Sequence, residues 1–95
     1  MRMPLRIFKA ADRSMEPAIK GGEYLIATGW FGKLKPGDIV VLEHPARRIK
    51  IVKRISALSD NSVYVLGDNR EMSEDSRSFG YVDRAAVAGK VICII

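Results

Sequence analysis

The chain has 95 residues, the size of one small domain, and 16 Lys and Arg against 11 Asp and Glu give it a formal net charge of +5. Hydrophobic residues at 47% and charged residues at 28% exclude an intrinsically disordered chain. A single cysteine excludes an internal disulfide and a Cys-cluster zinc site, and the longest apolar run, residues 91–95, is far shorter than the ~20 residues that cross a bilayer. We therefore expect a soluble, cytoplasmic protein, membrane-associated only if an anchor has been removed from it.

Turn residues divide the chain into short segments with the composition of β-strands. Met15-Glu16-Pro17 predicts a turn or the start of a short helix, Lys35-Pro36-Gly37-Asp38 predicts a type II turn, and Asp83 is a candidate cap for one helical turn through Ala86. The polar segment 67–80 is predicted to be a loop. The expected strands cover residues 5–10, 23–28, 39–43, 48–58, 63–66 and 88–95. The sequence thus predicts a mostly β fold, with residues 1–95 forming a single small domain of short antiparallel strands.

The long predicted strand places one lysine among isoleucines. Side chains alternate between the two faces of a strand, so Ile49, Ile51, Lys53 and Ile55 point to the same side. Burial disfavours an ammonium group and lowers its pKa, which makes a buried lysine a candidate general base. The alternative is that Lys53 lies near the strand end and extends its ammonium into water.

Two motifs favour the catalytic interpretation of that lysine. Ser14-Met15-Glu16-Pro17 follows the first strand, and a long polar run fills residues 67–80 with the pattern Gly-Asp-Asn-Arg-x-x-Ser-x-Asp-Ser-Arg-x-x-Gly. Together with Lys53-Arg54 and Gly37-Asp38-Ile39-Val40-Val41, these motifs resemble the type I signal peptidase (leader peptidase) family of Ser/Lys proteases. The resemblance extends from about Phe8 to Val91. It implies a signal-peptidase-like or repressor-protease-like catalytic core.

The resemblance also implies a role for each matched residue. Ser14 matches the nucleophile, whose hydroxyl needs a base near neutral pH, and Lys53 matches that base. Ser73 matches the serine that orients the lysine ammonium by hydrogen bonding. The Ser14 backbone N–H is expected to contribute to the oxyanion hole, and no metal or organic cofactor is expected. Residues expected to support the site are Asp68, Asn69, Asp75 and Arg77.

The residue two positions before the nucleophile departs from the family pattern. Relatives often have Ser or Gly there, which helps to form the oxyanion hole, whereas this chain has Asp12. A carboxylate beside a developing oxyanion is repulsive unless it points away or is neutralised, and Arg13 is the candidate for neutralising it. Membrane-bound relatives have an N-terminal transmembrane anchor, and none is expected within these 95 residues. Only residues 55–66 stand where many relatives insert an accessory β domain.

These shortened features resemble the soluble nickel-type superoxide dismutase maturation proteases, which remove a short leader from a precursor. The stretches Val-Val-Leu-Glu-His-Pro (40–45) and Ile-Val-Lys-Arg (51–54) also resemble that subgroup. The predicted partner is therefore a precursor protein or leader peptide bound in extended form. The first alternative is the catalytic core of a membrane-anchored signal peptidase I. A self-cleaving repressor domain is disfavoured because the one Ala-Gly pair, Ala88-Gly89, lies downstream of Ser14, and no DNA-binding module is present.

A non-catalytic basic β-barrel binding module is the alternative from a different functional class. Five basic residues cluster between Arg47 and Arg54, as in some nucleic-acid-binding proteins. Aromatic residues for base stacking are few, with one Trp, three Tyr and three Phe, so nucleic acid is not a predicted partner.

Five other residues have predicted structural roles. His44 precedes a proline and is expected in a surface turn, and Cys93 is expected to be a buried core thiol. Trp30 is expected at an exposed apolar tip, together with Phe31. Met15 either lines the substrate cleft or packs in the core.

Overall fold

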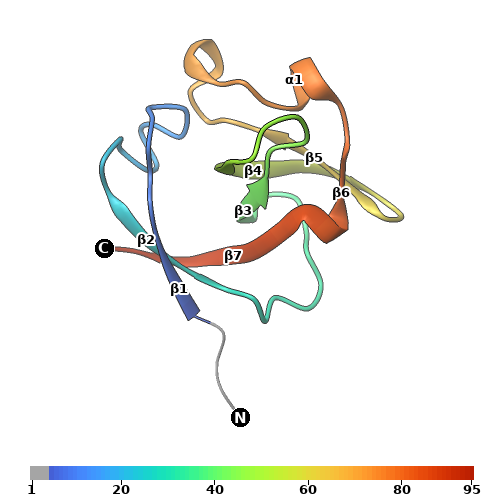
Figure 1. The fold of residues 1–95 in the computed structure, drawn as a ribbon, viewed down its shortest axis with the longest axis horizontal. Helices are drawn as coiled ribbons and strands as arrows, with labels where there is room; N and C mark the ends of the chain where they lie inside the picture. The colour runs from blue at the N-terminus through green and yellow to red at the C-terminus, as the bar shows by residue number, and fades with distance from the viewer. Residues whose placement is uncertain (1–4) are drawn as a thin grey trace.

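The computed structural model describes residues 5–95, which form one curled antiparallel sheet (Figure 1). Its seven strands have the order β1-β2-β7-β3-β4-β5-β6. The mostly β, single-domain prediction is confirmed. The ends of the six predicted strands differ by at most two residues from those observed, and the two-residue strand at residues 82–83 was not predicted. The strands are β1 (Leu5–Lys9), β2 (Tyr24–Thr28), β3 (Ile39–Glu43), β4 (Lys50–Ser59), β5 (Ser62–Leu66), β6 (Val82–Asp83) and β7 (Val87–Ile94).

The curled sheet encloses two groups of apolar side chains that meet at β3. Val40 and Leu42 belong to one cluster and Val41, on the opposite face, belongs to the other. This explains why β3 is a continuous apolar run, because a strand buried on both faces has no polar side. The first cluster also contains Leu34, Ile55, Val63, Val65, Val82 and Val87. The second contains Ala10, Met15, Ile19, Leu25 and Ala27.

Local turn chemistry is confirmed at two predicted positions. Gly37 has φ +98°, and the Asp38 N–H donates to the Lys35 carbonyl at 3.1 Å, as in a type II turn. The Asp83 side chain accepts from the Ala85 N–H at 2.8 Å and begins the 3₁₀ turn η2 (Arg84–Ala86). Both turns hold strands that carry core residues.

The segment 67–80 is more regular than the predicted loop. It contains a 3₁₀ turn, η1 (Arg70–Met72), and a short helix, α1 (Ser76–Phe79). Asp75 caps α1 by accepting from the Arg77 N–H at 3.2 Å. In Figure 1 this segment (orange) and the turn that follows β1 (blue) lie at the same end of the molecule.

Two of the structural expectations are wrong. Cys93 is exposed near the end of β7, because it pairs with Ile26 on the outer side of the sheet. His44 is buried, because its ring packs edge-on against Phe79 at 5.1 Å and its Nδ1 accepts from the Ala46 N–H.

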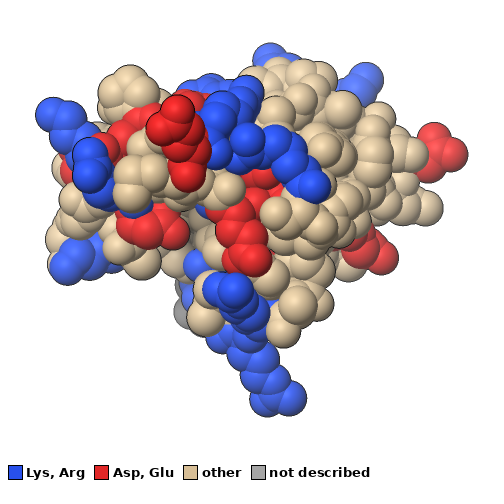
Figure 2. Space-filling model, turned by 90° about the horizontal axis from the view of Figure 1, so that it is seen from above, with Lys and Arg blue, Asp and Glu red and all other residues tan. Residues whose placement is uncertain are grey.

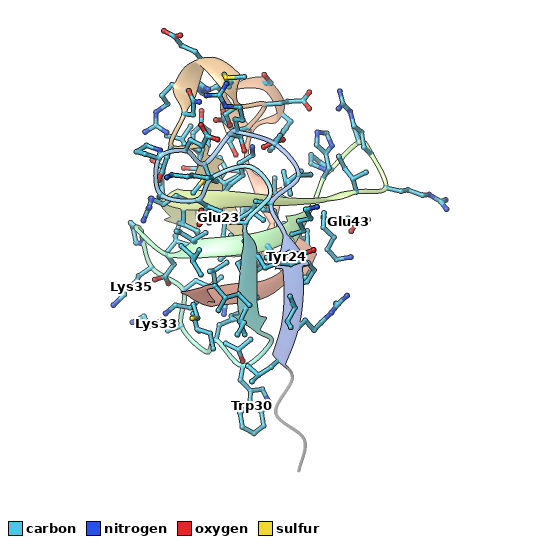
Figure 3. All side chains as sticks on the ribbon, turned by 90° about the vertical axis from the view of Figure 1, so that its left-hand side faces the viewer. Glu23, Tyr24, Trp30, Lys33, Lys35 and Glu43 are labelled. Atoms are coloured by element: carbon cyan, nitrogen blue, oxygen red, sulfur yellow. The ribbon has the colours of Figure 1, made fainter. Side chains whose placement is uncertain are left out.

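The expectation for Trp30 is confirmed, and the structure decides between the two alternatives for Met15. Trp30 is 55% exposed and projects from the end opposite the segment 67–80 (Figure 3), as predicted, whereas Phe31 packs against the core. Met15 is buried in the second cluster, which confirms its packing alternative. Within residues 5–95, no helix has the length and apolar character needed to cross a membrane.

Candidate active site

Ser14 and Lys53 line one cleft of about 190 Å³, although they lie far apart in the sequence. Residues 9–14 at the end of β1 form one wall, and residues 49–53 at the start of β4 form the other. Both side chains are deeply placed, since Ser14 is 3% exposed and Lys53 is 2% exposed. The fold therefore brings together the two residues that the sequence identified as nucleophile and base.

Lys53 is buried by its register in the sheet. It pairs with Val40 of β3 and shares its face of β4 with Ile51 and Ile55, which pack in the first apolar cluster. The alternative of an ammonium extended into water is therefore wrong. Burial lowers the pKa of Lys53, whereas the nearby charges of Asp12, Asp75 and Glu74 raise it, and the net result lies below the ordinary value.

The segment after β5 holds the turn that carries Ser14. The Asn69 N–H donates to the Ser14 carbonyl at 2.8 Å, and Asn69 Nδ2 donates to the Arg13 carbonyl at 3.1 Å. A Cβ on Gly67 would lie 2.7 Å from the Ser14 carbonyl oxygen and would overlap the Ser73 hydroxyl. Glycine is therefore required at position 67, because the two backbone segments approach each other too closely for a side chain. Asn69 binds the turn that carries Ser14 directly.

Asp75 is the centre of the hydrogen bonds around Ser73. Its carboxylate is 0% exposed and accepts from the Gly67 N–H at 2.9 Å, from Ser73 Oγ at 2.8 Å and from Arg77 Nε at 2.9 Å. Burial alone would raise the pKa of Asp75, but the hydrogen bonds from Arg77, Gly67 and Ser73 outweigh it and place the pKa well below its ordinary value. Because the Ser73 hydroxyl donates to Asp75, its oxygen is left as an acceptor, which is what a lysine ammonium requires.

Asp68 binds Arg54, a residue that the sequence analysis named in the Lys53-Arg54 motif but gave no role. Arg54 Nε and Nη2 both donate to the Asp68 carboxylate at 2.9 Å, and Arg54 Nη1 donates to the Gly37 carbonyl at 2.9 Å. This bidentate pair attaches the segment 67–80 to β4 beside Lys53. The signal available in the sequence was the position of Arg54 directly after the candidate base.

The segment 67–80 has a second attachment that sequence reasoning missed. His44 Nδ1 accepts from the Ala46 N–H, so its Nε2 carries the proton and donates to Glu74 Oε1 at 3.2 Å. Arg47 approaches the same carboxylate at 3.4 Å. Glu74 lies between Ser73 and Asp75, so these contacts tie the β3–β4 turn to the candidate site.

Asp12 engages the N–H group that the sequence assigned to the oxyanion hole. Its Oδ1 accepts from the Ser14 N–H at 2.9 Å. The expected neutralisation by Arg13 is not found, because Arg13 Nε donates to Glu16 Oε1 at 3.0 Å. Burial alone would raise the pKa of Asp12, but the hydrogen bonds from Ser14 and the charge of Lys53 outweigh burial, and the net pKa is below the ordinary value.

Across residues 5–95, no group of three or more His, Cys, Asp or Glu side chains is arranged to hold a metal ion.

Comparison with known proteins identifies the family of this chain. The family model described as "Signal peptidase, peptidase S26" matches residues 3–63 and 56–95. The chain belongs to the S26 signal peptidase family. Its S26 relatives include the protein named Signal peptidase IB from Staphylococcus aureus strains Mu50, N315 and MW2, each 63% identical over 27 residues. That match covers 28% of this chain and 14% of each relative, so family membership rests on the family model.

Proposed function

We propose that this protein is a serine endopeptidase that uses Ser14 and Lys53 to remove an N-terminal leader from a precursor protein. One observation carries the proposal: a serine and a lysine, both buried, line one cleft in a member of the S26 signal peptidase family. The lowered pKa of Lys53 supports a role as general base, because the neutral amine is the form that accepts a proton.

In the proposed reaction, Ser14 Oγ attacks the carbonyl carbon of the scissile peptide bond, and Lys53 Nζ takes the hydroxyl proton. The tetrahedral intermediate collapses, the C–N bond breaks, and Lys53 returns the proton to the leaving amine. Lys53 then removes a proton from water, which attacks the acyl-enzyme ester. The bond between the acyl carbon and Ser14 Oγ breaks, Lys53 returns the proton to Ser14 Oγ, and the leader is released with a free carboxylate. Ser73, held by Asp75, is the proposed acceptor that orients the lysine.

The sheet offers a place for an extended peptide beside these groups. β5 pairs with β4 only from Arg54 onward, so the backbone of residues 50–53 has no strand partner on that side. β1 pairs only with β2, and its end forms the opposite wall of the cleft. We therefore propose that the substrate binds in extended form between β1 and β4, through backbone hydrogen bonds.

For the substrate, we propose the precursor of a nickel-type superoxide dismutase. Support comes from the resemblance of residues 40–45 and 51–54 to those maturation proteases, and from the short β4–β5 hairpin that stands where larger relatives insert a domain. The alternative, the core of an anchored signal peptidase I, predicts cleavage of secretory precursors instead. Cleavage of purified precursors of both kinds, with the products identified by mass spectrometry, separates the two.

The binding-module alternative is weakened by the partners of the basic cluster. Arg47 pairs with Glu74 at 3.4 Å, Lys50 pairs with Glu43 at 3.3 Å, and Arg54 binds Asp68. Lys53 is buried. Figure 2 accordingly shows acidic and basic side chains intermixed on this face, rather than a continuous basic surface of the kind that follows a nucleic-acid backbone.

Four substitutions test the proposed function. Ser14→Ala and Lys53→Ala are expected to abolish precursor cleavage while thermal unfolding remains cooperative. Ser59→Ala and Lys33→Ala are matched controls at exposed positions outside the cleft, and both are expected to cleave at the wild-type rate. Normal turnover by Lys53→Ala would refute the dyad, and salt-dependent nucleic-acid binding without any cleavage would favour the alternative.

A further inference from the structure

The Asp12 carboxylate is the acidic group that lines the cleft, and the proposed reaction does not use it. It lines the cleft with Ser14 and Lys53, and its Oδ1 accepts from the Ser14 N–H at 2.9 Å. Arg13 follows it directly in the sequence but binds Glu16. Asp12 therefore brings an anion to the catalytic groups without a guanidinium bound to it.

The contact between Asp12 and Ser14 affects the electrophilic side of the reaction. The oxygen of the scissile carbonyl becomes negative in the tetrahedral intermediate and needs donors directed at it. The Ser14 N–H is such a donor, but its hydrogen bond is made to Asp12. A substrate oxyanion at the same N–H would also lie beside a carboxylate of like charge, which is unfavourable in a partly buried cleft.

The same carboxylate acts on the base. Among the charged groups that affect Lys53, Asp12 contributes most toward the ammonium form, followed by Asp75 and Glu74, whereas Arg77 acts in the opposite direction. An ammonium cannot accept the proton of Ser14, so a negative charge beside Lys53 opposes activation. Both effects of Asp12 therefore hold the site in a form that does not react.

We propose that Asp12 is a positioning residue that keeps the site inactive: its carboxylate occupies the Ser14 N–H and shares the cleft with Lys53 until an extended substrate displaces it. This inference rests on the proposed peptidase function. Displacement is feasible because Asp12 is exposed, and the contact joins residues only two positions apart. Rotation of the Asp12 side chain then frees the Ser14 N–H and, in the same step, moves the negative charge of Asp12 away from Lys53.

Two substitutions at Asp12 separate these effects. Asp12→Asn removes the charge but keeps an oxygen that can accept from the Ser14 N–H, whereas Asp12→Ala removes both. We expect the acidic limb of the kcat/KM profile to move to lower pH in both variants. We expect kcat/KM to rise at least about tenfold in Asp12→Ala and less in Asp12→Asn, because Asp12 competes with the substrate for an oxyanion donor that is worth about a hundredfold or more. Asp60→Asn, in the β4–β5 turn, is the matched control for loss of a carboxylate and is expected to leave both parameters unchanged.

A measurement without substrate completes the test. The Ser14 amide resonance is followed by NMR while the pH is lowered through the titration of Asp12; it is expected to shift in the wild type and in Asp60→Asn but not in Asp12→Ala. The role of Asp12 is overturned if the Ser14 amide resonance does not shift in the wild type, or if Ser14-dependent cleavage is no faster in Asp12→Ala. Either result leaves the proposed function standing. Absence of Ser14-dependent cleavage from the wild type and both variants overturns the peptidase function itself.

Discussion

Replacing Asp75 by Asn tests whether the buried carboxylate is the structural centre of the site. The substitution keeps the shape of the side chain but turns one of its two oxygens into a donor. If the amide nitrogen replaces Oδ1, it opposes the N–H and Nε of Arg77; if it replaces Oδ2, it opposes the Gly67 N–H. Each arrangement leaves at least one donor facing another donor inside the site.

The size of the effect follows from those lost hydrogen bonds. A buried donor left without a partner costs about 1–3 kcal/mol, and loss of the charge weakens the remaining bonds, so Asp75→Asn should lower the free energy of unfolding by about 2–4 kcal/mol. For a domain of this size each kcal/mol corresponds to about 4–8 °C in Tm. We therefore expect a fall in Tm of at least about 8 °C at pH 7, measured by circular dichroism.

The pH dependence of Asp75→Asn provides an internal check. The pKa of Asp75 is lower in the folded protein than the value of about 3.9 in an unfolded chain. The carboxylate thus contributes stability that is fully present above pH 4 and is lost as the pH falls toward the folded pKa. The Tm difference between wild type and variant should shrink as the pH is lowered below 4. A Tm within 2 °C of wild type at pH 7, or a difference that grows in acid, would refute this account; Asp60→Asn is the control for loss of an exposed carboxylate.

Three further substitutions probe the groups around the dyad. Gly67→Ala should reduce precursor cleavage by about a hundredfold, because its methyl group would displace the Ser14 carbonyl oxygen, 2.7 Å from the added Cβ, and steady-state kinetics check this. Arg54→Lys should lower the free energy of unfolding by about 1 kcal/mol in urea titrations, because a lysine cannot replace the bidentate contact with Asp68, and an unchanged value would contradict that role. Lys53→Met should be inactive but should have a higher Tm than wild type at pH 7. This gain in Tm should vanish above about pH 10.4, because the lowered pKa of the buried lysine opposes folding only while the lysine of the unfolded chain is protonated.

The strands could be predicted from the sequence for local reasons, whereas the proposed pairing of Ser14 with Lys53 was predicted from motifs that resemble a family. Period-two alternation placed Lys53 on the isoleucine side of a long strand, and Pro36-Gly37 specified a type II turn, which depends on backbone angles that only a few residues favour. Strand ends were less certain, because pairing with a neighbouring strand decides where a strand stops. β4, for example, begins at Lys50, where Glu43 is its partner across the hairpin.

The sequence analysis underestimated the burial of His44 and overestimated the burial of Cys93. A histidine before a proline is commonly a turn residue, but packing against Phe79 and a hydrogen bond to Glu74 bury this one. Cys93 lies in an apolar run, but its face of β7 points away from both clusters. Burial of a side chain depends on which elements cover it, and residues distant in the chain supply that cover.

The amino-acid sequence by itself determined a small, basic, mostly β domain and the motifs that carry Ser14 and Lys53. Tertiary structure decided how the positive charge is used: Lys53 is buried, and Arg54 binds Asp68. It also decided that Asp12 engages the Ser14 N–H. The physical reason is that propensity and alternation act between neighbours in the chain, whereas burial, pairing of charges and the pKa of a buried group depend on the distances that folding sets.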